Sequence, residues 1–274
     1  MVNIAGLEMK NPVMVASGTF SKDCADYLNL DKLGAIVTKT ITLNEKPGNP
    51  PPRICETPSG MLNSIGLQNP GIKAFIEKDL PFYAKYKTPL IASIAGTTIE
   101  EYAQCAKILS AERSVKALEL NVSCPNVKQG GMAFGTDPKI ISALIKAVKK
   151  NTPLPIIVKL TPNVTDIVEI ALAAEKAGAD AITAINTVLA MAFDIKTGQP
   201  KLANGMGGLS GPAIKPIAIR CVYQICQKVK IPAIGCGGIM SKEDMQEFFL
   251  AGAKAVQVGC GNFIDPELPL NLIR

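Results

Sequence analysis

The residues best suited to chemistry lie around Cys124. Residues 117–122 form an apolar run typical of a strand, and Pro125 can neither donate to a strand ladder nor allow helical geometry at Cys124. A thiol is therefore expected where a strand ends and a loop begins, flanked by the amides of Asn121 and Asn126. Most cysteines are small buried hydrophobic groups, so Cys124 acts as a base only if nearby cations or amides favour its thiolate.

Histidine is absent from the sequence. Its absence excludes a Ser-His-Asp triad, a histidine metal site and a histidine general base, so acid–base work falls to Cys, Lys, Asp, Glu or Tyr. The eight cysteines are scattered and contain no Cys-x-x-Cys pair. We interpret them as free thiols of a cytoplasmic protein, and we expect neither disulfides nor a metal site.

Two lysines interrupt strand-like runs, Lys39 after Val37-Thr38 and Lys159 after Val158. A lysine inside an apolar strand is costly unless it lies at the rim or is paired. Each could simply be a strand-end lysine that reaches solvent. Two lysines facing one end of a sheet indicate a site that stabilises negative charge.

Glycines follow the last two predicted strands, at Gly237-Gly238 and at Gly259. After strands seven and eight of a barrel, glycines let backbone N–H groups approach a phosphate. A tight turn is the alternative at each position. Because both positions carry glycine, the pattern favours a phosphate site.

A polar loop that contains glycine, residues 63–71, precedes a predicted helix. One interpretation is a capping turn with Asn69 at the start of the helix. The other is a ligand loop, in which Asn63 and the backbone of residues 64–67 hold a bound molecule.

The elements that position these residues alternate regularly along 274 residues. Apolar runs alternate with helical patterns, which indicates a parallel sheet with both faces covered. The length suits one (β/α)8 TIM barrel of about 250 residues, expected as a single domain over residues 1–274; an open doubly wound sheet is the alternative. The predicted strands are 13–16, 35–40, 90–95, 117–122, 156–160, 181–186, 233–236 and 255–259, and the predicted helices are 25–33, 71–86, 99–111, 138–150, 165–177, 213–229 and 241–251.

Additions to this barrel are expected in three places. Residues 2–16 predict a short N-terminal β-hairpin with its turn at Gly6. Glycine-rich insertions, residues 125–137 and 189–211, follow the fourth and sixth strands, on the face where barrel enzymes carry their catalytic loops. Only about fifteen residues follow the last strand, and two prolines interrupt them, so we expect that the closing C-terminal helix is missing or the sequence is truncated.

The net charge of +6 comes mostly from lysines spread over helical faces. This distribution favours a solvated surface over a nucleic-acid site, because such a site needs clustered charge. No apolar run reaches about 18 residues, and the N-terminus lacks the pattern of a secretory signal. We therefore expect neither a membrane span nor a nucleic-acid partner.

Together these motifs resemble those of class 1 dihydroorotate dehydrogenases, in order and over nearly the whole chain. The segment 127–138, which contains Gly130-Gly131 and Phe134-Gly135, looks like that of class 1B catalytic subunits. The other motifs that carry the resemblance are Asn121-Val122-Ser123-Cys124-Pro125-Asn126, Lys39-Thr40, the loop from Asn63 to Asn69, Lys159, Asn186-Thr187, Ser210-Gly211-Pro212 and Gly237-Gly238.

The resemblance implies an FMN-containing barrel that oxidises (S)-dihydroorotate to orotate in pyrimidine (UMP) biosynthesis. It implies that Cys124 is the base that removes the C5 proton while hydride passes from C6 to flavin N5, and that Lys159 offsets the negative charge of reduced flavin. The implied FMN contacts are Ser17, Lys39, Thr40, Ser93, Asn121, Lys159, Ile185, Gly211, Gly237, Gly238, Gly259 and Cys260. The implied orotate contacts are Lys39, Asn63, Ser64, Ile65, Gly66, Leu67, Asn121, Asn186 and Thr187.

The resemblance also implies a partner. It implies that the chain, like class 1B catalytic subunits, forms the homodimer core of a heterotetramer. The second kind of subunit in that assembly carries FAD and a 2Fe-2S cluster and delivers electrons to NAD. Class 1A relatives are homodimers that use fumarate instead. Which acceptor this chain serves is left open by the sequence.

Two motifs depart from the family pattern, since Ser93 replaces the usual Asn and Gly259-Cys260-Gly261 replaces Gly-Thr-Ala. With the short C-terminus, they keep open a catalytically degenerate subunit that only binds flavin or assists assembly. A dihydropyrimidine dehydrogenase-like enzyme is a further alternative. A dihydrouridine synthase acting on tRNA would share the Cys-Pro motif, but such enzymes rely on histidine, which is absent.

Overall fold

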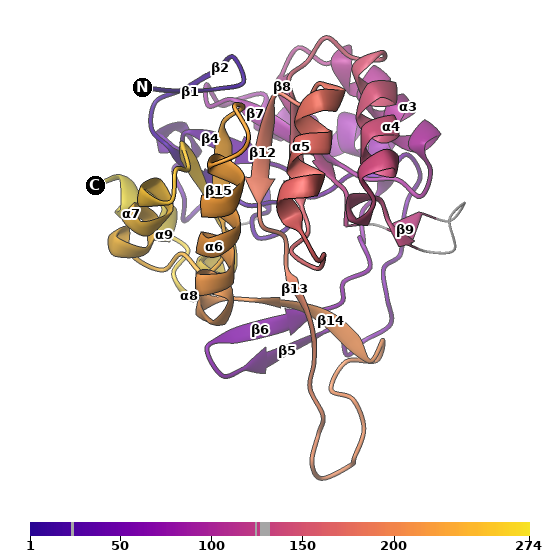
Figure 1. Cartoon of the computed structure of the whole chain (residues 1–274), viewed down its shortest axis with the longest axis vertical. Helices are drawn as coiled ribbons and strands as arrows, with labels where there is room; N and C mark the ends of the chain where they lie inside the picture. Colours follow the sequence, from indigo (N-terminus) through magenta and orange to yellow (C-terminus); the bar gives the residue numbers. More distant parts are fainter. Residues whose placement is uncertain (23–24, 124, 127–131) are drawn as a thin grey trace.

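In the part of the chain that the computed structural model describes, residues 1–22, 25–123, 125–126 and 132–274, eight parallel strands close into a barrel (Figure 1). The pairing of β16 with β3 completes the ring. The predicted TIM barrel is therefore confirmed, and the alternative, an open doubly wound sheet, is excluded. Around the ring the strands are β3 (Val13–Val15), β4 (Ala35–Val37), β7 (Leu90–Ile94), β8 (Val115–Asn121), β11 (Ile156–Leu160), β12 (Ala181–Ala184), β15 (Ala233–Cys236) and β16 (Ala255–Val258).

Helices follow most of the strands and begin where the sequence predicts. Thr98 caps α3 by accepting from Glu101 N, and Ser241 and Asp244 form a capping box on α7. Gly178 ends α5 with a φ of 102°, which a glycine adopts without strain. The helices are α1 (Gly71–Ala74), a π-helical turn (Phe75–Asp79), α2 (Leu80–Tyr83), α3 (Ile99–Ser110), α4 (Pro138–Lys149), α5 (Ile167–Ala177), α6 (Lys215–Cys226) after a short 3-10 turn (Pro212–Ile214), and α7 (Lys242–Leu250).

The predicted helix over residues 25–33 is wrong. These residues form turns that lead into a single 3-10 turn, Leu30–Lys32. The side chain of Asn29 accepts a hydrogen bond from Asp31 N. Asn and Asp side chains compete in this way with helical hydrogen bonds, and here the local turn wins.

The insertion after the sixth strand is more ordered than a glycine-rich loop. It forms β13 (Val188–Met191) and β14 (Met206–Ser210), which join a hairpin of β5 (Ile54–Thr57) and β6 (Gly60–Asn63) from the segment after β4. The four strands make an antiparallel sheet below the barrel in Figure 1. In the insertion after the fourth strand, β9 (Pro125–Asn126) pairs with β10 (Met132–Ala133).

Layers of inward-facing side chains fill the barrel, contributed by alternate strands. The lowest layer consists of Ala35, Ala117, Ala181 and Ala255, and the next of Met14, Ile91, Ile157 and Ile234. Because four alanines leave space, the predicted N-terminal hairpin, β1 (Val2–Ile4) with β2 (Leu7–Met9), inserts Ile4, Leu7 and Met9 against them. The hairpin therefore closes the amino-terminal end of the barrel and leaves the opposite end for chemistry.

Replacing Met9 with alanine is expected to lower the free energy of unfolding by about 2–5 kcal/mol, because a cavity would remain beneath the alanine layer. Met9 is 1% exposed, whereas the neighbouring Glu8 is exposed. Urea unfolding of Met9→Ala and of the control Glu8→Ala checks this role. Equal and small effects of the two changes would show that the hairpin does not close the barrel.

After β16 the chain forms two short helices, α8 (Gly261–Ile264) and α9 (Leu268–Ile273), rather than one long closing helix. The buried side chains of Leu268, Leu270 and Leu272 hold α9 in place. Among the described residues, no helix is long and apolar enough to cross a bilayer.

Candidate active site

The carboxyl ends of β3, β4, β7 and β8 meet around the hydroxyl of Thr40. Its Oγ1 lies 3.1 Å from Ser17 Oγ and 3.0 Å from Ser93 Oγ, and it accepts from Asn121 Nδ2 at 3.4 Å. These four predicted site residues come from widely separated parts of the sequence and are brought together by the barrel. Ser93 is fully buried, and its hydroxyl shares a hydrogen bond with that of Thr40.

A second cluster joins two asparagine amides next to the position of the predicted base. Asn186 Nδ2 donates to Asn121 Oδ1 at 3.1 Å and to Ser123 Oγ at 2.9 Å. Tyr102 anchors this strand end by donating from its hydroxyl to the carbonyl oxygen of Asn121. Cys124 itself lies outside the described residues, and its assignment as base stays a prediction.

The two predicted lysines both lie at the carboxyl end of the barrel but differ in environment. Lys39 is half-buried, and its Nζ would lie 3.3 Å from a Cβ on Gly18. Burial, and then the charge of Arg53, lowers the pKa of Lys39. Lys159 is 6% exposed and donates to Gln257 Oε1 at 2.9 Å.

Lys159 keeps its charge although it is buried. Burial, the largest single influence, would lower its pKa, but the interactions with Cys236 and Glu119 opposite it together outweigh burial, and the pKa is raised. The pKa of Cys236 is itself raised, chiefly by burial. Cys236 is therefore a neutral thiol at neutral pH, which leaves Glu119 as the negative charge beside Lys159.

A buried polar layer beneath the mouth is a feature that the sequence analysis missed. Glu119 Oε2 accepts from Thr183 Oγ1 at 3.0 Å and from Gln257 Nε2 at 2.5 Å. Glu119, Thr183 and Gln257 are each fully buried and lie on alternate strands β8, β12 and β16. The available signal was a polar residue between apolar neighbours in each of these strands, which places it inside the barrel.

Backbone turns after β15 and β16 form a floor that fits a phosphate. Gly237 and Gly238 have φ values of 137° and 72°, which favour glycine, and the Gly211 carbonyl oxygen would lie 2.7 Å from a Cβ on Gly238. A Cβ on Gly259 would meet nothing closer than 4.0 Å, so the space above it is open. Burial, the larger influence, raises the pKa of the Cys260 thiol, although a hydrogen bond with the side chain of Ser210 in β14 acts to lower it. A glycine-lined cradle with open space is what a phosphate needs.

The loop of residues 63–67 is held over the mouth by the antiparallel sheet. Asn63 pairs in register with Gly208, and a Cβ on Gly208 would collide with Thr187 Oγ1. The glycine thus lets Asn63 and Thr187, both predicted orotate contacts, approach the same backbone segment. Asn49, which the sequence analysis did not single out, supports the loop by donating to Ser64 Oγ at 2.9 Å.

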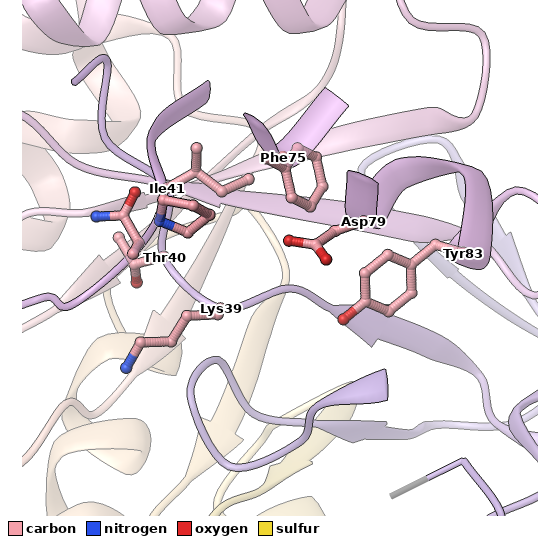
Figure 2. A pocket seen from close by; sticks show the side chains of 8 residues that line it. Lys39, Thr40, Ile41, Phe75, Asp79 and Tyr83 are labelled. Carbon is pink, nitrogen blue, oxygen red and sulfur yellow. The ribbon is translucent and has the colours of Figure 1, made fainter. Parts of the chain in front are cut away.

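A small cavity of about 50 Å³ opens beside the mouth (Figure 2). It is lined by Lys39, Thr40, Ile41, Asn69, Pro70, Phe75, Asp79 and Tyr83. Figure 2 shows Lys39 running away from Asp79, whose carboxylate binds Lys22 at 3.0 Å. Because ligand pockets usually measure about 300–1,000 Å³, this cavity adjoins the site rather than being the site.

The described cysteines away from the mouth are free thiols, as the sequence predicts. All six described cysteines are free, and Cys105 and Cys221 are fully buried. Burial, with a smaller contribution from Glu101, raises the pKa of Cys105 to about 12. Such thiols are inert at neutral pH.

A closed parallel barrel whose mouth joins lysines, asparagine amides and a glycine-lined floor defines a class, the TIM-barrel enzymes. Comparison with known proteins identifies the family. The family described as dihydroorotate dehydrogenase matches residues 1–274. The chain therefore belongs to the dihydroorotate dehydrogenase family, whose members are flavin-dependent oxidoreductases.

Similar proteins carry the name dihydroorotate dehydrogenase B (NAD(+)), catalytic subunit. One, from Anoxybacillus flavithermus, is 55% identical over 274 residues, which cover 99% of this chain and 88% of the relative. Another, from Alkaliphilus metalliredigens, is 57% identical over 275 residues, which cover 100% of this chain and 91% of the relative. A third, from Geobacter metallireducens, is 57% identical over 267 residues, with 97% and 88% covered.

Proposed function

We propose that this chain is the catalytic subunit of a dihydroorotate dehydrogenase that oxidises (S)-dihydroorotate to orotate in UMP biosynthesis and passes electrons to NAD through a partner subunit. The observation that carries the proposal is the cluster of Thr40, Asn121 and Asn186, which contacts Ser123, the residue before Cys124 in the sequence. The names of its relatives support it, because they specify this activity and this acceptor.

The polar groups of the mouth match the chemistry of orotate, a planar ring with amide edges and one carboxylate. The amides of Asn63, Asn121 and Asn186 both donate and accept hydrogen bonds, as the ring edges require. Lys39 supplies the cation for the carboxylate. The remaining contacts proposed for the substrate are Ser64, Ile65, Gly66, Leu67 and Thr187.

FMN fits the glycine-lined floor. When bound, it supplies the acceptor for the hydride that leaves C6 of dihydroorotate. Its phosphate would be held at Gly211, Gly237, Gly238, Gly259 and Cys260, and the rest of the molecule by Ser17, Lys39, Thr40, Ser93, Asn121, Lys159 and Ile185. Lys159 is the preorganised cation of this set, because it is buried and held by Gln257 and Glu119 of the barrel interior.

Cys124 is the proposed base. Its thiolate takes the proton from C5 of dihydroorotate, and the amides of Asn121 and Asn186 orient the ring beside it. This assignment requires no histidine, in agreement with the composition of the chain.

The proposed assembly is a homodimer of this chain joined by a subunit that carries FAD and a 2Fe-2S cluster, in the cytoplasm. The support comes from the relatives' names, which call them catalytic subunits and specify NAD(+). Purification from the native cell, followed by iron and FAD assays, tests the partner. A homodimer that lacks both and reduces fumarate would contradict it.

The activity is tested by mixing the FMN-loaded chain with substrate without oxygen. Dihydroorotate is expected to bleach the flavin, whereas dihydrouracil, which lacks the carboxylate that Lys39 binds, is expected to bleach it far more slowly. Faster bleaching by dihydrouracil would indicate a dihydropyrimidine dehydrogenase-like enzyme. No bleaching by either would indicate a subunit that only binds flavin.

Orotate affinity is expected to fall as pH rises through the pKa of Lys39. Only the protonated lysine attracts the carboxylate, so binding is strongest below this pKa and is lost above it. Because burial and Arg53 lower the pKa of Lys39, the loss begins at a lower pH than for an ordinary lysine. Perturbation of the flavin spectrum by orotate measures the affinity. Lys39→Met should abolish the pH dependence, and the exposed control Lys32→Met should preserve it; a flat profile in the unmodified chain would exclude this role.

A further inference from the structure

Glu119 carries a charge that the proposed mechanism does not use. It is fully buried inside the barrel, one layer below the mouth, and among the described residues it and Lys159 are the only charged side chains that are buried. A buried carboxylate is costly unless it is paired and hydrogen-bonded. Its presence in the barrel interior therefore requires a physical reason.

The two oxygens of Glu119 have different environments. Oε2 accepts from Thr183 Oγ1 and Gln257 Nε2. Oε1 is buried without a hydrogen-bond partner and lies 4.0 Å from Lys159 Nζ. Its free lone pairs thus face the ammonium, which is held at 2.9 Å by the other end of the same Gln257 amide.

Gln257 links the two charges and can do so in only one orientation. Its Nε2 donates to the carboxylate while its Oε1 accepts from the ammonium. The reverse orientation would place a carbonyl oxygen against a carboxylate and an N–H against an ammonium. The amide therefore fixes Lys159 laterally, and the carboxylate opposes it from below.

We propose that Glu119 is a positioning residue, the counter-ion that holds the Lys159 ammonium charged at the foot of the mouth through direct attraction and through Gln257. Its consequence for the flavin rests on the proposed function, in which Lys159 contacts FMN. The pair carries no net charge, so the barrel can keep a cation ready without an uncompensated charge in its interior.

The groups that face Lys159 support Glu119 as this counter-ion. Among the residues that the structure describes, the titratable side chains are Glu119 from β8 and Cys236 from β15, with Cys260 beyond Cys236. Burial raises the pKa of both thiols, so neither supplies a negative charge at neutral pH. Without Glu119, burial, which lowers the pKa of Lys159, would be opposed only by the hydrogen-bonding contacts with Gln257 and Cys236.

The direct test measures the protonation of Lys159 in the full chain, with and without FMN, by NMR of lysines labelled with ¹³C at Cε. The signal is assigned by its loss in Lys159→Met. In Glu119→Gln, which keeps the shape of the side chain but removes its charge, the acid dissociation constant of Lys159 is expected to rise about tenfold or more. Glu119→Asp, which keeps the charge, should remain closer to the unmodified chain.

A second readout is the flavin midpoint potential as a function of pH, measured by reductive titration with dithionite. In Glu119→Gln the potential should become more negative than in the unmodified chain over the pH range in which Lys159 loses its proton. When Glu119→Gln is added to Lys159→Met, this pH-dependent shift of the flavin potential should be absent, because no ammonium remains to lose a proton. Glu175→Gln is the matched control, since Glu175 is half-buried and accepts from Lys230 N and Ile231 N outside the barrel interior.

An unchanged Lys159 titration in folded Glu119→Gln would overturn the proposal. If that variant does not fold, the same NMR titration of Lys159 in the unmodified chain tests the proposal. A Lys159 that loses its proton more readily than an ordinary lysine would overturn the proposal, and one that keeps its proton to higher pH would support it. Neither measurement uses dihydroorotate, so a failure of the proposed activity remains distinguishable from a failure of this inference.

Discussion

Replacing Cys124 with alanine is expected to slow the reduction of bound FMN by dihydroorotate about 10²–10⁴-fold, the usual contribution of a general base. FMN should remain bound, because the proposed flavin contacts come from other residues. Anaerobic stopped-flow measurement of flavin bleaching gives the rate, and the absorbance of the purified protein gives the flavin content.

The control for this experiment is Cys226→Ala, which removes a thiol from the end of α6, outside the barrel. It should reduce flavin at the unmodified rate. Cys124→Ser should reduce flavin at a rate between those of Cys124→Ala and the unmodified chain, because a hydroxyl can occupy the same position but gives up its proton less readily than a thiol. Near-normal flavin reduction in Cys124→Ala would exclude this residue as the base.

Replacing Lys159 with methionine is expected to make the flavin midpoint potential more negative by about 60–90 mV, which corresponds to about 2.7–4 kcal/mol for a two-electron couple. The reason is the loss of Lys159, the one buried cation among the described residues. Potentiometric titration of the FMN-loaded chain measures the shift. Lys254→Met, an exposed lysine at the amino-terminal end of the barrel, is the control and should leave the potential unchanged.

Lys159→Met should also destabilise the fold, because Glu119 would remain as an unpaired buried charge. Breaking a buried pair in this way costs about 3–5 kcal/mol. Adding Glu119→Gln should recover part of that free energy of unfolding while leaving the potential low. A double variant that is less stable than either single one, or an unshifted potential in Lys159→Met, would contradict the assigned role of the lysine.

The barrel strands could be located from sequence because each is a short continuous apolar run bounded by helix caps. The residues at their ends could be grouped for the same reason, since the carboxyl ends of parallel strands in a barrel converge whatever the details of packing. Ser17, Thr40 and Asn121 were therefore placed together correctly although they lie far apart in the chain. The class of site followed from their chemistry.

Predictions from apolar spacing failed where a local side-chain hydrogen bond or a partner distant in the sequence decides the structure. Residues 25–33 have apolar spacing compatible with a helix, yet Asn29 turns the chain instead. The sheet of β5, β6, β13 and β14 joins segments more than a hundred residues apart, and neither segment predicts the other. The need for glycine at position 208 becomes clear only from the structure, because a Cβ there would collide with the side chain of Thr187.

The sequence by itself determined the barrel, its catalytic end and the chemical types gathered there, because periodicity and strand polarity are local properties of the chain. Only the tertiary structure decided that Glu119, Thr183 and Gln257 form one hydrogen-bonded layer beneath Lys159. Each looks like an isolated polar residue in an apolar strand. Their pairing depends on the closure of the ring, which brings β8, β12 and β16 to face one another across a dry interior where a charge must find its partner.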